Sequence, residues 1–280
     1  METLKTNKDQ LKLDNKLVEK VLVKFVREAV ASAELSKAVV GLSGGVDSAV
    51  SCAIAARALG PENVLAVMIP FKTSSPESIS DAEEVVAKTG VRSEVADITS
   101  MAEPYIHEHD EIGKVRIGNV LARLRMIVLY DRSAREKALV VGASNKSEIL
   151  LGYGTLHGDL ASAINPIGDL YKTQVWDLAE YLGLPENVIK KKPTADLWEG
   201  QTDEDELGFT YRKVDVLLYY MIDERRNDKE LTEMGFTKNF IDHVRELVRK
   251  NQFKRRMPLI AKISNRTMNV DFRYVRDWGT

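Results

Sequence analysis

A glycine-rich loop carries the clearest chemical signal in this sequence. The loop consists of Gly41, Leu42, Ser43, Gly44, Gly45, Val46, Asp47 and Ser48. Glycine admits positive φ angles and lets backbone amides come close to an anion. Where such a loop opens a helix, its free amides and the positive end of the helix dipole bind phosphate oxygens, and serine hydroxyls add donors. Asp47 would repel a bare phosphate, so its position predicts that it binds a magnesium ion.

The alternative is a plain turn from strand to helix, with glycines at the bend and serine or aspartate as the cap. The string has neither the spacing of the dinucleotide fingerprint nor a Gly-Lys-Ser/Thr ending. The complete string SGGVDS directly after VVGL favours a phosphate loop. It resembles the pyrophosphate-binding loop of the adenine nucleotide alpha hydrolase families, in which ATP is cut between its α and β phosphates and an adenylated intermediate forms. The loop indicates a class of reaction and says little about the substrate.

A phosphate loop needs a strand before it and a helix after it, and the surrounding pattern predicts both. Short apolar runs typical of buried parallel strands alternate with stretches of helical periodicity. Right-handed crossovers place the C-terminal ends of such strands at one edge of the sheet, where ligands bind. The predicted strands are 38–42, 64–69, 94–98 and 138–142, and the predicted helices among them begin near residues 14, 47, 78 and 117.

The second half of the chain has a different pattern. From 145 to 169 the periodicity gives way to Gly, Ser, Asn, Thr and Asp, which is typical of a functional or mobile loop. The acidic segment 191–207 is a candidate lid. Helices are predicted at 173–182, 185–190, 211–224 and 238–250. We expect one domain, with an α/β core at about 14–170, a helical part at about 171–258 and a tail at 259–280 to which no role is assigned.

Composition limits the classes of function. The 280 residues are 44% hydrophobic and 29% charged, which is ordinary for a soluble globular protein. A formal net charge of −2 does not favour a broad nucleic-acid-binding surface. The single cysteine, Cys52, excludes an internal disulfide, and no run approaches the roughly 20 apolar residues of a membrane span. The polar N-terminus lacks a secretory signal, so we expect a cytoplasmic protein without membrane or nucleic-acid partners.

Further motifs narrow the substrate. They are SGGVDS, NVLARLRM, NKSE, GYGT-x-x-GD, NPIGDLYKTQV, KPTADLWEGQTDE and FKRRMP, spread over about 39–258. In this order they resemble the NAD synthetase family in its ammonia-dependent form. The resemblance implies an α/β fold with a Rossmann-like parallel sheet flanked by helices, of the adenine nucleotide alpha hydrolase type, and a helical C-terminal extension. It also implies ATP-dependent amidation of deamido-NAD by ammonia, through an adenylated intermediate and with release of AMP and pyrophosphate.

The resemblance implies roles for individual residues. Asp47 and Glu148 correspond to the family's magnesium ligands, and two carboxylates that bracket a triphosphate suit this cation. Lys172 and Thr194 correspond to contacts with ATP, where a lysine would offset the charge of the departing pyrophosphate. The implied catalytic residues are Asp47, Lys172 and Asp159. The implied contacts with deamido-NAD are Arg123, Thr155, Asp159, Phe253 and Lys254.

Each assignment has a plainer alternative. Glu148 could cap a helix, Thr194 could be a turn residue, and Phe253-Lys254 could be the basic end of a surface helix. Arg123 and Arg125 point to different faces of their predicted helix, so at most one faces the site.

Three positions depart from the pattern seen in other members. Leu156, Ala163 and Ala143 stand where some members carry lysine, aspartate and threonine. The substrate contacts of those side chains must therefore be made differently here. The residues that would activate the nucleotide are unaffected.

The expected partners are the substrates deamido-NAD, ATP and ammonia, with Mg²⁺ as the cofactor. No room remains for an amidase domain, so glutamine would require a separate partner, and direct use of ammonia is simpler. The family resemblance implies a homodimer. One alternative is a tRNA-modifying enzyme with the same loop, which the single cysteine and the net charge of −2 argue against. Another is a protein that binds ATP without catalysis.

Overall fold

The computed structural model describes residues 8–109, 112–194, 200 and 202–268. Four parallel strands form one sheet in the order β3-β2-β1-β4. The strands at 37–41, 64–68 and 138–141 are apolar runs because they are buried on both faces, whereas the edge strand at 92–95 is polar and mostly exposed. Val39 pairs with Leu65 on one side and with Val140 on the other. The strands are β1 (Lys37–Gly41), β2 (Val64–Met68), β3 (Arg92–Val95) and β4 (Ala138–Val141).

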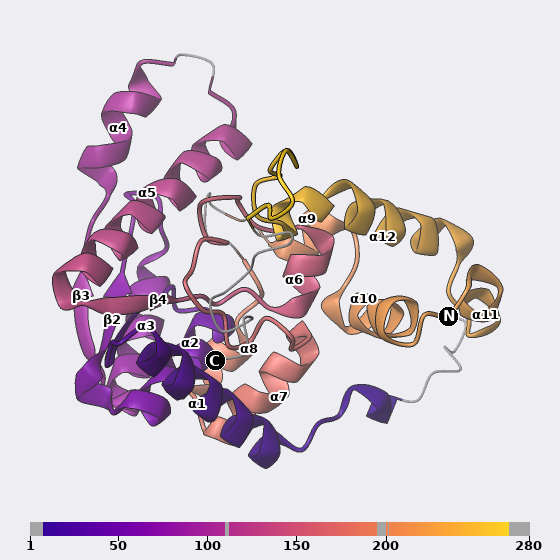
Figure 1. The fold of residues 1–280 in the computed structure, drawn as a ribbon, viewed down its shortest axis with the longest axis horizontal. Helices are drawn as coiled ribbons and strands as arrows, with labels where there is room; N and C mark the ends of the chain where they lie inside the picture. The colour runs from indigo at the N-terminus through magenta and orange to yellow at the C-terminus, as the bar shows by residue number, and fades with distance from the viewer. Residues whose placement is uncertain (1–7, 110–111, 195–199, 201, 269–280) are drawn as a thin grey trace.

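Helices cover both faces of the sheet (Figure 1). Strand residues alternate between the two faces, so Val40 packs in one core and Val39 in the other. The first core is closed by α1 (Asn15–Ser32), α2 (Val46–Leu59), α3 (Pro76–Thr89), α7 (Lys172–Leu182) and α8 (Glu186–Lys190). The other is closed by α4 (Thr99–His107) and α5 (Lys114–Glu136). The predicted α/β class, with a parallel sheet flanked by helices, is confirmed.

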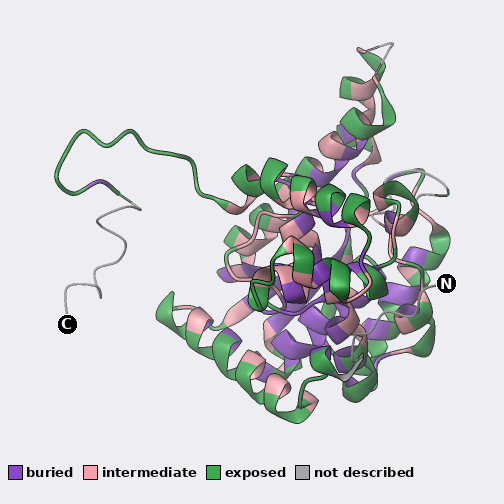
Figure 2. Cartoon of the chain, turned by 90° about the vertical axis from the view of Figure 1, so that its right-hand side faces the viewer, coloured by how far each residue is buried: buried purple, intermediate pink, exposed green. Residues whose placement is uncertain are grey.

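A second group of helices forms its own core beside the sheet. Trp176 of α7 packs against both the first core and this one, and its ring meets Tyr211 edge-on at 6.4 Å. Burial is therefore continuous from the sheet into this group (Figure 2). The group consists of α10 (Tyr211–Leu218), a π-helical turn (Tyr219–Asp223), α11 (Asp228–Glu233) and α12 (Lys238–Lys250), with Leu11 of the 3-10 turn Lys8–Leu11.

Several short elements differ from the sequence prediction. The segment 145–169 was expected to lack structure, but it begins with α6 (Lys146–Leu151), which is too short to show a helical period. The third strand ends at Val95, before the predicted 98, and 211–224 is divided between α10 and the π-helical turn. The remaining short elements are α9 (Asp203–Leu207) and the 3-10 turns Pro61–Asn63 and Gln252–Arg255. Within the described ranges, no helix is both long and apolar enough to cross a membrane.

Burial of α7 predicts the effect of a matched pair of substitutions. Leu178 is fully buried in the first core, whereas Leu17 of α1 is 58% exposed. We expect Leu178→Ala to lower the free energy of unfolding by about 2–5 kcal/mol, because it removes buried methyl groups and leaves a cavity. Leu17→Ala should change it by less than about 1 kcal/mol. Urea unfolding followed by circular dichroism measures both, and equal effects would contradict the assigned packing of α7.

Candidate functional site

A cavity of about 590 Å³ opens at the C-terminal edge of the sheet. Strand β2 lies on one side of β1, whereas β4 lies on the other side. The chain therefore changes direction between β1 and β4, and ligands bind at such a switch point in parallel sheets. The loops after β1, β2 and β4 all contribute to the cavity wall. One part of the wall is apolar, with Ile69 and Leu129, and another part is charged.

The predicted phosphate loop lies in this wall between β1 and α2. Its side chains hold its shape: the Ser48 hydroxyl donates to Gly45 O at 2.9 Å and accepts from Ser43 N at 3.2 Å. Gly45 precedes the first turn of α2, whose backbone N–H groups have no partner inside the helix. These amides and the exposed Ser43 hydroxyl face a space that suits phosphate oxygens.

Gly44 allows the loop to pass close to α3. Its φ angle is +77°, which disfavours any residue with a side chain. A Cβ atom at this position would lie 2.3 Å from the carbonyl oxygen of Ser78 in α3. The glycine is therefore required both by its backbone conformation and by the packing of α3.

Three charged side chains meet beside the phosphate loop. Lys172 Nζ lies 2.5 Å from Asp47 Oδ2 and 3.1 Å from Glu148 Oε1. Lys172 is 2% exposed, and its ammonium lies 5.2 Å from the centre of the Tyr211 ring. The three residues come from the starts of α2, α6 and α7, so three separate helices position them. The structure thus brings together the predicted Asp47, Glu148 and Lys172.

Asn145 links the carboxylates of this cluster. Its side-chain amide donates to Asp47 Oδ1 at 2.8 Å, and its Oδ1 accepts from Glu148 N at 3.0 Å. Glu148 Oε2 in turn accepts from Asn145 N at 3.3 Å, which completes a capping box at the start of α6. Glu148 therefore caps a helix with one oxygen and contacts Lys172 with the other.

The charges of the cluster affect each other's ionisation. Burial lowers the pKa of Lys172, but the negative charges of Asp47 and Glu148 outweigh burial and hold that pKa above its ordinary value. Lys172 therefore stays an ammonium ion at neutral pH. Burial raises the pKa of Glu148 above its ordinary value, and the nearby Asp47 adds to this shift, whereas the adjacent Lys172 offsets part of it.

The carboxylates of Asp47 and Glu148 fit a magnesium ion. Both already converge on a single cationic atom, Lys172 Nζ, and carboxylate oxygens are ligands that Mg²⁺ prefers. Among the described residues, no group of three or more His, Cys, Asp or Glu side chains could enclose a metal. Mg²⁺ usually takes one or two carboxylates together with substrate phosphates, so a pair beside the phosphate loop suits it.

The loop 152–169, which follows α6, also contributes to the cavity wall. Asp159 accepts from Thr155 N at 2.8 Å, and the Thr155 hydroxyl donates to Asn119 of α5 at 2.9 Å. Lys254 Nζ donates to the carbonyl oxygens of Gly152 and Gly154, at 2.8 and 2.9 Å. The predicted Thr155, Asp159 and Lys254 all line the cavity.

Two other predicted contacts do not line this cavity. The Phe253 side chain is 59% exposed. Arg123 is exposed and donates to the carbonyl oxygen of Leu156 at 3.2 Å, so it contacts the loop 152–169 from outside the cavity. Arg125 faces the cavity instead and donates to Ile69 O at 3.0 Å. The two arginines do point to different faces, as their spacing predicted, and a contact of Arg123 or Phe253 with substrate stays a prediction.

The candidate lid supplies residues that sequence analysis did not single out. Asp203 is 3% exposed and accepts from the Tyr211 hydroxyl at 3.2 Å. Glu206 accepts from the Tyr153 hydroxyl at 2.7 Å. The acidic string around α9 was a signal for both, although nothing in it showed which side chains turn inward. Thr194 lines the cavity, whereas 195–199 and 201, within the predicted lid, lie outside the described residues.

Comparison with known proteins identifies the family. The family model for NAD synthase matches residues 18–258. The NH(3)-dependent NAD(+) synthetase of Chlorobium phaeobacteroides (strain BS1) is 56% identical, covering 97% of this chain and 98% of that protein.

Two solved structures have the same fold. The NH3-dependent NAD synthetase of Campylobacter jejuni is 37% identical with a TM-score of 0.77, covering 89% of this chain and 100% of that one. The NMN synthetase of Francisella tularensis is 29% identical with a TM-score of 0.79, covering 90% and 100%. The family predicted from the motifs is confirmed: this chain belongs to the NAD synthase family.

Proposed function

We propose that this chain converts deamido-NAD to NAD with ATP and ammonia, with Mg²⁺ as its cofactor. The observation that carries the proposal is the Asp47–Lys172–Glu148 cluster beside the phosphate loop, in a cavity large enough for a nucleotide. Such a cluster suits transfer of an adenylyl group, because it places cationic and metal-binding groups where pyrophosphate would leave. An ATP-binding protein without catalysis would not need a buried lysine between two carboxylates.

The first chemical step needs little from the protein beyond positioning. The nicotinate carboxylate of deamido-NAD is already a nucleophile, and it attacks the α-phosphorus of ATP while pyrophosphate leaves. The amides of the phosphate loop and the Lys172 ammonium would bind the departing oxygens. Mg²⁺, held by Asp47 and Glu148, would supply further positive charge to the phosphates.

In the second step ammonia attacks the acyl carbon of the adenylate. The carbon–nitrogen bond forms, AMP leaves with the electrons of the carbon–oxygen bond, and the nitrogen loses a proton. Asp159 is the group we propose to receive that proton, because its carboxylate is exposed to the cavity and fixed by Thr155. The segments 152–169 and 191–207 would exclude water from the adenylate.

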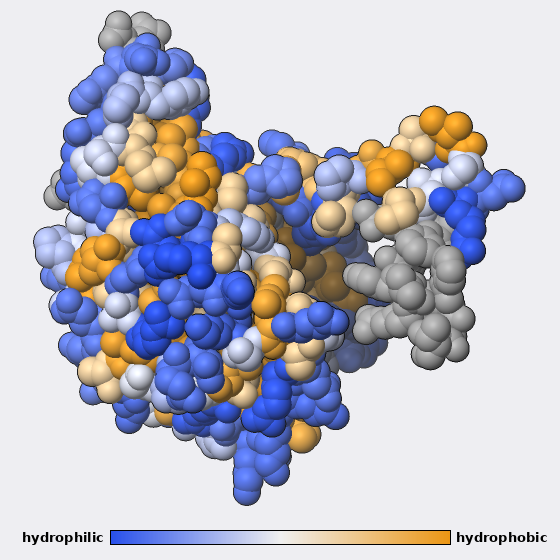
Figure 3. Space-filling view, turned by 60° about the vertical axis from the view of Figure 1, so that its left-hand side comes forward, coloured by the Kyte–Doolittle hydropathy of each residue, from blue (hydrophilic) through white to orange (hydrophobic). Residues whose placement is uncertain are grey.

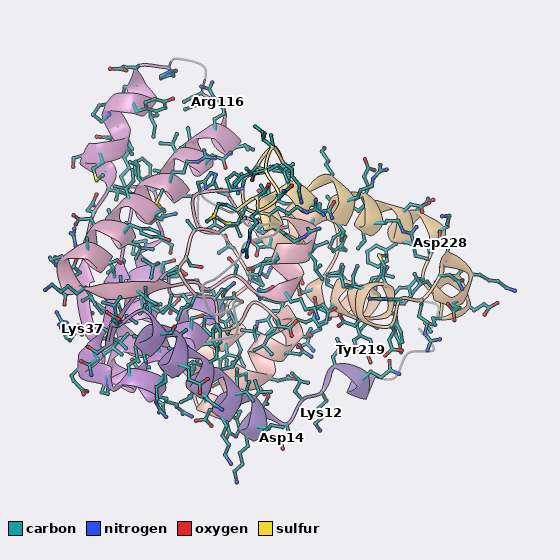
Figure 4. All side chains as sticks on the ribbon, in the orientation of Figure 1. Lys12, Asp14, Lys37, Arg116, Tyr219 and Asp228 are labelled. Carbon is teal, nitrogen blue, oxygen red and sulfur yellow. The ribbon has the colours of Figure 1, made fainter. Side chains whose placement is uncertain are left out.

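We also propose that the chain works as a single domain and forms a homodimer. The α4–α5 arm projects from the body, with Arg116 near its tip (Figure 4). Apolar side chains gather on the surface of this arm (Figure 3). Among the residues of α5, Ile127 is 49% exposed. Val115, near the start of the same helix, lines the cavity and is 69% exposed, so a partner that also covered this end of α5 would lie next to the substrate. A cytoplasmic location suits an enzyme that consumes ATP and whose only cysteine is free.

Product analysis tests the reaction. With ATP, Mg²⁺, deamido-NAD and ammonium, we expect AMP and NAD in equal amounts and no ADP, because adenylation releases one AMP for each amide formed. Nicotinate mononucleotide is tested in parallel as an alternative substrate, because one structural relative is an NMN synthetase. Turnover with that substrate alone would keep the adenylation chemistry and overturn deamido-NAD as the substrate. Formation of ADP, or no cleavage of ATP with any acceptor, would contradict the proposed reaction.

Substitution of the two carboxylates tests the site. We expect Asp47→Ala and Glu148→Gln to lower kcat by about 10²–10³-fold or more, because each removes charge that stabilises the transition state. Glutamine also completes a capping box, so Glu148→Gln should keep α6. Glu180→Gln, an exposed position on α7, is the matched control. Circular dichroism verifies folding, and near-normal kcat in either variant would rule out the two-carboxylate magnesium site.

Sedimentation velocity tests the dimer. Ile127→Asp should convert a dimer to monomers, because it buries an unpaired charge in an apolar interface. Leu17→Asp makes the same kind of change in the exposed apolar stripe of α1 and should leave the dimer intact. If only the Leu17 variant dissociates, the interface lies on α1. A wild-type monomer at all concentrations would refute the dimer.

A further inference from the structure

Asp215 is a buried carboxylate that lies outside the cavity wall. It belongs to α10, in the second core, and its side chain is 0% exposed. Burial of a charge is costly unless hydrogen bonds replace its hydration. Three donors do so: the Ser147 hydroxyl at 2.6 Å, Thr173 N at 2.9 Å and the Thr173 hydroxyl at 2.9 Å. A residue that satisfies this many donors in an otherwise apolar core needs an explanation.

The donors are neighbours of the charged cluster. Ser147 precedes Glu148 in α6, and Thr173 follows Lys172 in α7. The Ser147 hydroxyl also accepts from Lys172 N at 2.9 Å. Asp215 is therefore joined by hydrogen bonds to the backbone at the start of α7 and to the residue beside Glu148. One carboxylate holds the starts of the two helices that carry Glu148 and Lys172.

The ionised form of Asp215 suits this arrangement. Burial raises its pKa to about 6, while the hydrogen bonds from Ser147 and Thr173 act to lower it. Its position at the first turn of α7 also places a negative charge where the helix dipole is positive. All three hydrogen bonds use Asp215 as the acceptor, as an ionised carboxylate requires.

A second contact between the same parts of the chain supports this reading. Asp223, in the turn after α10, accepts from Lys146 Nζ at 3.0 Å and from the Tyr171 hydroxyl at 3.0 Å. Lys146 is the first residue of α6, and Tyr171 is the N-cap of α7. Asp215 and Asp223 thus each form hydrogen bonds with the beginnings of both α6 and α7. Only the Asp215 contact is fully buried.

We propose that Asp215 is a positioning residue, which fixes the distance between Glu148 and Lys172 through Ser147 and Thr173 and so sets the geometry of the magnesium and pyrophosphate site. The proposal rests on the roles proposed above for Glu148 and Lys172. It gives the helical extension a part in catalysis without contact with any substrate. The precision needed is high, because a displacement of about 1 Å in such a site can cost about 10²-fold in rate.

Two substitutions separate positioning from stability. Asp215→Asn preserves shape and retains one acceptor, which can stay on Thr173, but it turns an amide N–H₂ toward the Ser147 hydroxyl. Ser147→Ala removes the same connection from the other end and serves if Asp215→Asn fails to fold. The control is Leu231→Ala, which creates a cavity in the same core, at a fully buried residue of α11 that is absent from the Asp215 contacts.

Steady-state kinetics well below the melting temperature should distinguish the variants. For Asp215→Asn we expect kcat to fall about 10–100-fold and the Mg²⁺ concentration for half-maximal rate to rise, as when supporting partners of metal ligands are lost. The KM for deamido-NAD should change by less than about 3-fold, since a distant α10 residue does not contact this substrate. The double variant with Ser147→Ala should be close to Asp215→Asn alone, because both break one connection. Leu231→Ala should lower Tm but keep kcat and the Mg²⁺ requirement within about 2-fold.

The opposite pattern would overturn the proposal. If Asp215→Asn and Ser147→Ala lower Tm but leave kcat and the Mg²⁺ requirement at the control's values, Asp215 serves stability only. Glu148→Gln, assayed in the same series, keeps this outcome separate from failure of the proposed site. Loss of turnover in Glu148→Gln together with normal Asp215→Asn refutes the positioning role alone. Normal turnover in Glu148→Gln refutes the site on which it rests.

Discussion

The structure depends on one buried ammonium group. Lys172 is 2% exposed, and a charge removed from water to this extent must be paired. One partner, Asp47, lies more than one hundred residues before Lys172 in the sequence. The other partner, Glu148, belongs to α6. Removing one partner from such a buried pair typically costs about 3–5 kcal/mol, so the starts of α2, α6 and α7 are forced to meet. The same convergence forms the charged wall of the cavity.

The sheet makes this meeting possible. With β1 between β2 and β4, the loops after β1 and β4 open next to each other, and the phosphate loop lies beside the capping box of α6. Gly44 lets α3 pack directly against that loop. The second core then anchors α6 and α7 from behind through Asp215 and Asp223. The starts of α2, α6 and α7, which meet because of the fold, therefore also form the site.

The sequence predicted the strands, the long helices and the phosphate loop, because their signals are local: apolar runs, helical periods and glycines before a helix. It also predicted the residues Asp47, Glu148 and Lys172, through motifs characteristic of the family. It could not show that Asn145 bridges two carboxylates, since this requires β1 and β4 to be neighbours. The motifs implied a contact of Arg123 with substrate, yet Arg125 is the arginine that lines the cavity, because a helical period separates the two faces without showing which one meets the cavity. Asp203 was one of several acids in a short string, and only tertiary packing shows that it is buried.

The ring of Tyr211 has one further consequence. The centre of the ring lies 5.2 Å from Lys172 Nζ and 6.4 Å from the centre of the Trp176 ring, to which it is nearly perpendicular. Arg212 places a second cation 5.6 Å from that indole. The half-buried Trp176 thus lies one aromatic ring away from the charges that would rearrange around a nucleotide. The intervening Tyr211 and Lys172 are buried, where water screens electric fields weakly. The position of this indole therefore suits it to serve as an intrinsic optical reporter of the site, one that needs no added label.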